Sequence, residues 1–153
     1  MRVHIGVIGE GRCSRRVARD AERIGAAIAR AGAVLLTGGR GGVVVGILPG
    51  FARAEANRWV TVPIATGMDQ ARNVILVRSC DAIIAVGGMF GTLSEIGIGL
   101  KLGVPVVGLR TWRLAPPDPR RVPVIRATDP DDAVTQALSA ANRRRGRART
   151  WLA

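Results

Sequence analysis

The chain has 153 residues, of which 48% are hydrophobic and 22% charged, and its formal net charge at pH 7 is +12. This length is typical of one domain with its own hydrophobic core, so we expect a single domain over 1–142 and a basic tail over 143–153. Two cysteines and one histidine exclude a disulfide framework and a zinc site, and indicate a reducing, cytoplasmic location. No apolar run reaches membrane-spanning length, which excludes a membrane partner.

Arginine supplies nearly all of the positive charge, since Lys101 is the only lysine. One arginine cluster, 143–149, is predicted to form a solvated or disordered tail, and another, 12–23, can lie along one side of a helix. Nucleic acid is therefore a partner to consider. However, aromatic residues make up only 3% of the chain, which does not suggest a base-stacking surface. We favour a small-molecule partner over nucleic acid.

Apolar runs alternate with segments of helical period along the chain. The predicted strands are 3–8, 33–37, 60–63, 82–86, 105–109 and 122–125, with a further apolar run at 43–48. The predicted helices are 14–31, 69–79, 92–102 and one that starts at Pro130. Ser14, Asp69 and Asp129 are the expected N-caps, and Gly32 the expected residue after the first helix. The order predicts an α/β fold, a doubly wound (Rossmann-like) parallel sheet with helices on both faces.

One connection does not follow this pattern. Only Gly38-Gly39-Arg40-Gly41-Gly42 separates the second strand from the apolar run at 43–48, whereas a parallel crossover needs a dozen or more residues. A crossover helix is therefore missing. Either the protein has lost it, which would make the two runs an antiparallel or irregular pair, or a stretch of the natural chain is absent from this sequence.

Glycine-rich turns follow three of the predicted strands, at one edge of the predicted sheet. Glycines leave room for a ligand and let backbone amides point toward an anion, so three such turns indicate a site for a phosphate-bearing ligand. The alternative is that these glycines only permit tight turns and close packing. The candidate ligand-binding residues in and beside the turns are Gly9, Gly11, Ser14, Gly38, Gly39, Gly41, Gly42, Gly87, Gly88, Gly91 and Thr92.

Two charged residues, Arg72 and Glu95, are candidates for ligand binding and for catalysis. Glu95 could orient sugar hydroxyls or stabilise a cationic sugar transition state, and Arg72 could bind a phosphate. Each has a simpler interpretation. Thr92-Leu93-Ser94-Glu95 matches a capping box at the start of a helix, and Arg72 could be one surface arginine among many. Met68, Met89 and Phe90 could form a wall beside a flat heterocycle, or belong to the core.

The motif Gly87-Gly88-Met89-Phe90-Gly91-Thr92-Leu93-Ser94-Glu95, with Arg72 upstream, resembles the LOG-like Rossmann superfamily. Further segments, among them Thr37–Gly42 and Gly46–Gly50, are most similar to the small-protein branch that includes molybdenum-cofactor carrier proteins. This resemblance implies the Rossmann-like fold, a homodimer, and a pterin or nucleotide ligand that carries phosphate. No metal site and no required cofactor are implied; the molybdenum cofactor or a nucleoside monophosphate would be the ligand.

Other members of the superfamily are phosphoribohydrolases, which cleave a nucleoside 5′-monophosphate into free base and ribose 5-phosphate. In such an enzyme Glu95 and Arg72 would be the catalytic residues. Two differences favour binding over catalysis: Val86 stands where the enzymes usually have proline, and Asn73 stands where they usually have lysine. We therefore expect a binding protein for a phosphate-bearing ligand, with a LOG-type phosphoribohydrolase as the alternative.

Overall fold

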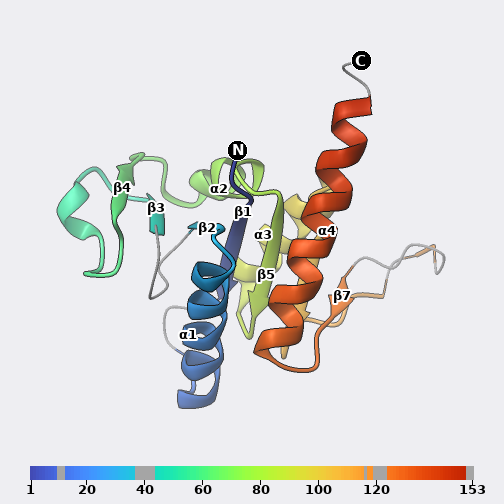
Figure 1. Ribbon diagram of the computed structural model, residues 1–153. Helices are drawn as coiled ribbons and strands as arrows, with labels where there is room; N and C mark the ends of the chain where they lie inside the picture. The colour runs from blue at the N-terminus through green and yellow to red at the C-terminus, as the bar shows by residue number, and fades with distance from the viewer. Residues whose placement is uncertain (10–12, 37–43, 116, 119–123, 151–153) are drawn as a thin grey trace.

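The computed structural model describes residues 1–9, 13–36, 44–115, 117–118 and 124–150. Within these residues the strands form one parallel sheet in the order β4-β3-β2-β1-β5-β6-β7 (Figure 1). The strands are β1 (His4–Gly9), β2 (Val34–Leu36), β3 (Val44–Leu48), β4 (Val62–Ala65), β5 (Ala82–Val86), β6 (Val106–Leu109) and β7 (Ile125–Arg126). The helices are α1 (Arg15–Arg30), α2 (Arg72–Arg78), α3 (Phe90–Lys101) and α4 (Pro130–Thr150), with short 3₁₀ turns η1 (Arg53–Glu55) and η2 (Asp69–Ala71).

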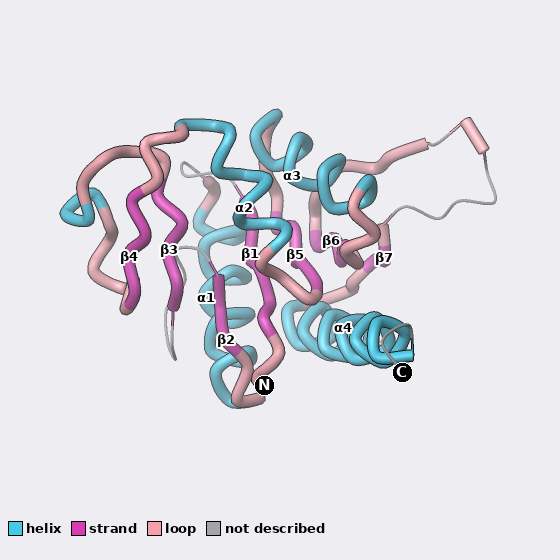
Figure 2. Tube along the Cα trace, turned by 90° about the horizontal axis from the view of Figure 1, so that it is seen from above, coloured by secondary structure: helices cyan, strands magenta, loops and turns pink. Residues whose placement is uncertain are grey.

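Helices cover both faces of the sheet, as the sequence predicts. α1 and α4 pack against each other on one face, and α2 and α3 on the other (Figure 2). The two faces hold separate hydrophobic clusters, one containing Ile24, Ile28 and Ile84 and the other Leu76, Ile83 and Ile96. Ile83 and Ile84 are neighbours in β5 that point to opposite faces, which explains why this buried strand is apolar at every position.

Three of the predicted helix signals are confirmed. The Ser14 side chain accepts a hydrogen bond from the Val17 amide (3.3 Å) at the start of α1. Gly32 has φ +68° just after the end of that helix, a conformation that favours glycine. Asp129 Oδ1 accepts hydrogen bonds from the amides of Asp131 (2.9 Å) and Asp132 (3.0 Å) at the start of α4.

Two other helix predictions are wrong. α3 begins at Phe90, two residues before Thr92, so the proposed capping box lies inside the helix and Glu95 does not cap it. Asp69 is not an N-cap either, because it has φ +45° and is the first residue of η2, which leads into α2. The strand predicted at 60–63 lies two residues later, as β4, and residues 122–123 of the last predicted strand fall outside the described residues.

The pairing of β2 and β3 is parallel, with Leu35 opposite Val44 and Leu36 opposite Val45. The antiparallel or irregular alternative is therefore wrong. No helix lies between these strands in the described part of the chain, and 37–43 is outside it. On the face of the sheet that α1 covers, Val60 packs against β3 in place of a crossover helix. A Cβ added at Gly46 would lie 2.8 Å from the Val60 side chain.

The arginine-rich end of the chain continues α4 as far as Thr150, so it is helical rather than disordered. Arg144 Nη1 donates to the Cys80 carbonyl (3.0 Å), and Arg145 Nη2 donates to the Met1 carbonyl (3.0 Å). Arg143 and Arg147 are exposed, as expected for a solvated segment. Among the described residues, no helix has the length and apolar character needed to cross a membrane.

Candidate functional site

The described ends of β1, β5 and β6 meet at one edge of the sheet, which we call the carboxyl edge. Gly9 pairs with Val86, and Val86 with Leu109. A Cβ at Gly9 would lie 2.7 Å from the Val86 carbonyl oxygen, so glycine allows β1 to end against β5. Ser14 lies beside this edge as the cap of α1. The remaining glycines of the first two turns, Gly11, Gly38, Gly39, Gly41 and Gly42, lie outside the described residues.

The turn after β5 requires glycine. Gly87 and Gly88 have φ values of +58° and +101°, which side chains rarely adopt. A Cβ at Gly88 would lie 2.4 Å from both Cβ and Oγ1 of Thr92. Thr92 is itself buried, so its side chain packs beneath the turn. The third turn is therefore a rigid backbone element supported by Thr92.

The turn leads directly into the N-terminus of α3. Met89, the N-cap, makes no side-chain cap, and the first helical hydrogen bond runs from the Leu93 amide to the Met89 carbonyl (3.0 Å). The amides of Phe90, Gly91 and Thr92 therefore have no acceptor within the helix. The space beside Gly91 is open. An anion at this point would gain both these donors and the positive end of the helix dipole.

Arg72 and Glu95, far apart in sequence, meet beside this helix. Arg72 is the first residue of α2, and its Nη1 lies 3.4 Å from Glu95 Oε1. The Glu95 side chain is only 8% exposed and the Arg72 side chain 24%. Burial raises the pKa of Glu95, and the Arg72 charge partly counteracts that rise. Arg72 Nε is also buried and has no hydrogen-bond partner among the described residues.

Asn73, which stands where the related enzymes usually have lysine, is a buried member of the site. Its Nδ2 donates to Ser94 Oγ (3.3 Å), and Ser94 Oγ donates to the Gly91 carbonyl (2.7 Å). Asn73 Oδ1 has no hydrogen-bond partner among the described residues. Asn73 thus joins α2 to the first turn of α3 and keeps an unused acceptor.

The segment after β6 supports the turn from the other side. Thr111 Oγ1 donates to the Gly87 carbonyl (2.5 Å), and Trp112 Nε1 donates to the Met89 carbonyl (3.2 Å). The rings of Trp112 and Phe90 have centroids 5.7 Å apart and a tilt of 39°. No local sequence signal marks this role of Thr111 and Trp112, because these contacts depend on β5 and β6 being neighbours in the sheet.

A hollow of about 640 Å³ opens beside this segment, at the end of β6. Arg110, one of its lining residues, has φ +52°, and its Nη2 lies 3.2 Å from Oδ2 of the buried Asp20 in α1. The lining residues are Gly108, Leu109, Arg110, Thr111, Arg113, Leu114, Arg126, Ala127 and Thr128. Its cationic groups give the hollow a positive character.

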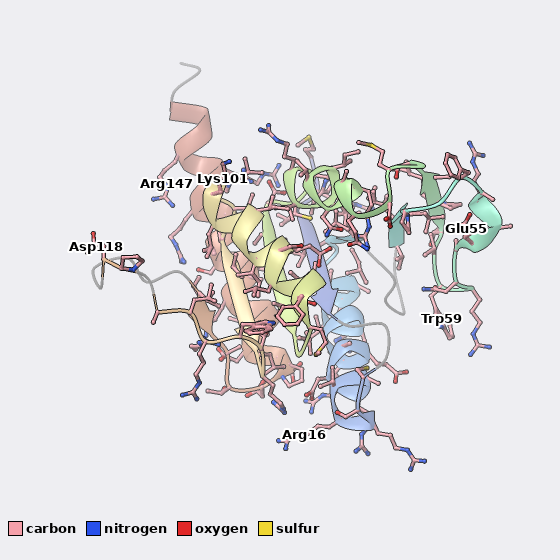
Figure 3. The ribbon with its side chains drawn as sticks, turned by 180° about the vertical axis from the view of Figure 1, so that it is seen from behind. Arg16, Glu55, Trp59, Lys101, Asp118 and Arg147 are labelled. Carbon is pink, nitrogen blue, oxygen red and sulfur yellow. The ribbon has the colours of Figure 1, made fainter. Side chains whose placement is uncertain are left out.

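Arginine also adds positive charge to the carboxyl edge outside this hollow. Arg16 projects into solvent from the first turn of α1 at this edge, whereas Lys101 and Arg147 lie at the opposite end of the sheet (Figure 3). Such a field attracts anionic ligands over several ångströms. No group of three or more His, Cys, Asp or Glu side chains in the described chain could hold a metal ion.

A doubly wound parallel sheet with a glycine-rich turn and an uncapped helix N-terminus at its carboxyl edge defines a Rossmann-like α/β protein. Within that class, the chain belongs to the SLOG cluster4 family, whose model matches residues 2–141. The predicted membership of the LOG-like Rossmann superfamily, with its branch of molybdenum-cofactor carriers, is thus confirmed.

Several solved structures and one further sequence are similar to the chain. The molybdenum cofactor binding protein of Rippkaea orientalis is 31% identical, with a TM-score of 0.79 over 91% of this chain and 97% of the other. The molybdenum cofactor carrier protein of Chlamydomonas reinhardtii is 30% identical, with a TM-score of 0.77 over 93% and 99%. An uncharacterised protein of Archaeoglobus fulgidus is 44% identical over an alignment of 122 residues, with a coverage of 71% of this chain and 80% of that protein.

Proposed function

We propose that this protein binds a small phosphate-bearing ligand at the carboxyl edge, and that the ligand to test first is the molybdenum cofactor. The observation that carries this proposal is the N-terminus of α3, where the amides after the Gly87-Gly88 turn have no helical acceptor. The similarity to molybdenum-cofactor carriers over almost the whole chain supports the choice of ligand.

In this proposal the backbone of Gly87, Gly88 and Gly91 receives the phosphate, and Thr92 holds the turn in shape. Arg72 adds positive charge, and its side chain is 24% exposed beside this position. Gly9 and Ser14 lie at the same edge. The other glycines of the first two turns, which lie outside the described residues, are proposed as further phosphate ligands.

A second candidate function is a phosphoribohydrolase acting on nucleoside 5′-monophosphates. The Arg72–Glu95 pair favours it, since a buried carboxylate held by a guanidinium could stabilise a sugar cation. Asn73 in place of lysine and Val86 in place of proline favour the binding protein.

The first experiment incubates purified protein and its Glu95→Gln variant with AMP and GMP, measures free base by chromatography, and records thermal unfolding with and without ligand. A binding protein should release no base, and its melting temperature should rise with GMP or molybdopterin in both forms. A ligand at 100 times its Kd adds about 2.7 kcal/mol of stability. Base release that disappears in Glu95→Gln would overturn the carrier proposal in favour of the enzyme.

We also propose a homodimer in the cytoplasm. Val74 and Ile75 of α2, and Val62 and Ile64 of β4, are exposed apolar side chains, which could be covered by a second copy. Sedimentation equilibrium of the wild-type protein and of a Val74→Asp/Ile75→Asp variant tests this: the variant should be monomeric, and a wild-type monomer would contradict it.

A further inference from the structure

Two large apolar side chains are exposed at the start of α3, where a ligand is proposed to bind. Phe90 is 72% exposed and Met89 58%. Exposing an aromatic ring forgoes the stabilisation that burial would give. The Phe90 ring lies against Trp112 with centroids 5.7 Å apart, so the chain brings two of its few aromatic residues together here.

The aromatic pair is held in place by hydrogen bonds on both sides of Trp112. The indole Nε1 donates to the Met89 carbonyl (3.2 Å), and the Trp112 carbonyl accepts from Arg126 Nη2 (2.8 Å). The neighbouring Thr111 is bound to Gly87. A ring fixed in this way loses little freedom when a ligand stacks on it, which is a condition for strong stacking.

Phe90 and Glu95 lie on different sides of α3. They are five residues apart, which at 100° per residue places their side chains about 140° apart around the helix axis. Glu95 faces Arg72 of α2, and Phe90 faces Trp112 in the segment after β6. The N-terminus of α3 lies between these two groups.

We propose that Phe90 and Trp112 form a stacking platform for the planar heterocycle of the ligand, on the β6 side of the phosphate position. This proposal rests on the proposed function, because it takes the phosphate at the N-terminus of α3 as its starting point. The neighbouring hollow of about 640 Å³ falls within the 300–1,000 Å³ that is usual for small-molecule sites. Exposed Arg113 and Arg126 line it and can donate to the carbonyl oxygens of a pterin or guanine.

A stacked base at Phe90 bears on the choice between binding and hydrolysis. A mononucleotide whose phosphate is at α3 and whose base stacks on Phe90 carries its glycosidic bond toward β6, on the side away from Glu95. The platform therefore favours a carrier, in which Arg72 and Glu95 hold another part of a larger ligand or keep α2 against α3.

The test compares GMP with ribose 5-phosphate, which has the phosphate and sugar but no heterocycle. Affinities are measured by titration calorimetry for the wild type, Phe90→Ala and Phe51→Ala. Phe51 is a matched control because it is also an exposed phenylalanine (89%) but lies far from the proposed platform. It precedes η1, and Glu55 of η1 lies across the molecule from Asp118 of the β6–β7 segment (Figure 3). Guanine shares the aminopyrimidinone ring of a pterin.

We expect Phe90→Ala to weaken GMP binding by about five- to hundredfold, as the loss of one stacked base does elsewhere, and to leave ribose 5-phosphate unaffected. Phe51→Ala should change neither affinity. If wild type binds both compounds but Phe90→Ala leaves GMP unchanged, the platform is overturned and the phosphate site stands. If wild type binds neither compound, both proposals are overturned.

A second measurement reports on Trp112 without altering the platform. In a Trp59→Phe/Trp151→Phe background Trp112 is the remaining tryptophan. Stacked guanine should quench its emission, whereas ribose 5-phosphate should not. Equal quenching by both compounds, or by neither at saturation, would contradict stacking at this position.

Discussion

The inner and outer parts of the sheet differ in how they are covered. Every residue of β5 and β6 is buried, because helices pack on both faces of these strands. At the outer edge, Val62 and Ile64 of β4 are each 44% exposed, although both are strong strand formers. The inner and outer strands are thus similarly apolar, and whether their residues are buried depends on whether a helix packs over them.

The candidate site lies entirely in the covered part of the sheet. The Gly87-Gly88 turn, the Arg72–Glu95 pair and the Phe90–Trp112 pair all surround β5 and α3, in the covered part of the sheet. Groups held by a well-packed scaffold keep their geometry when a ligand binds. The inner part should therefore be sensitive in both stability and binding, and the outer part in neither.

The largest expected effect comes from shortening one isoleucine in each part. Ile84→Ala in β5 should lower the free energy of unfolding by about 2–5 kcal/mol, because it leaves a cavity under α1 and α4. Ile64→Ala in β4 should cost about 1 kcal/mol or less, because the side chain is half exposed. Urea unfolding of both variants measures the contrast, and equal losses would show that the outer part is packed as firmly as the inner.

The next largest effect is expected from alanine substitutions at two glycines, Gly88 just before α3 and Gly97 inside it. Gly88→Ala should destabilise the protein by about 1–3 kcal/mol and abolish the thermal shift produced by GMP, since a Cβ there is strained and overlaps Thr92. Gly97→Ala, inside the helix and in open space, should raise stability by up to about 1 kcal/mol and keep the GMP response. A Gly88→Ala protein that still responds to GMP would exclude the turn from the site.

A smaller change in stability is expected from arginine substitutions near the end of α4, which packs over the inner part of the sheet. Arg144→Ala removes the hydrogen bond to the Cys80 carbonyl and should cost about 1 kcal/mol. Arg143→Ala, whose side chain is exposed, should change the unfolding free energy by about 0.5 kcal/mol or less. Equal values for the two variants would indicate that this part of α4 does not contribute to the fold.

The smallest effect is a pH dependence from Glu95. Because burial raises its pKa above the usual 4.5, the folded state holds this proton more tightly, and the contribution of Glu95 to stability falls as pH rises from 4.5 through the raised pKa. Glu95→Gln lacks this loss, so its stability relative to wild type should increase across that window. Arg72→Met should extend the window upward, since it removes the charge that lowers the pKa. A Glu95→Gln difference that is constant with pH would contradict the raised pKa.

The sequence predicts the strands and most helix boundaries because those signals are local. Ser14, Gly32 and Asp129 act on backbone groups within a few residues, and each is confirmed. The Thr92–Glu95 motif shows the limit of such signals. The turn with positive φ values at Gly87 and Gly88 is followed directly by α3, which begins at Phe90, two residues before Thr92. Glu95 therefore lies inside the helix, where it is buried against Arg72 and does not cap the helix start.

The candidate site is only partly predictable for the same reason. Arg72 and Glu95 were identified from a motif, but their 3.4 Å contact depends on α2 packing against α3. The role of Trp112 depends on β6 lying next to β5, and low overall aromatic content hides the fact that two aromatic rings meet. The parallel pairing of β2 with β3 also could not be predicted, since the usual crossover length argues against it.

The position of the two ends of the chain has a practical consequence. Arg145 binds the Met1 carbonyl, and α4 finishes near the same edge, opposite the carboxyl ends of the strands (Figure 1). A tag, a surface linker or a fused acceptor protein attached at either end would therefore leave the carboxyl edge, where we propose that the ligand binds, facing outward. Immobilisation through Met1 should give biosensor measurements in which the proposed site is unobstructed, and a fusion at either end would leave access to the carboxyl edge unchanged.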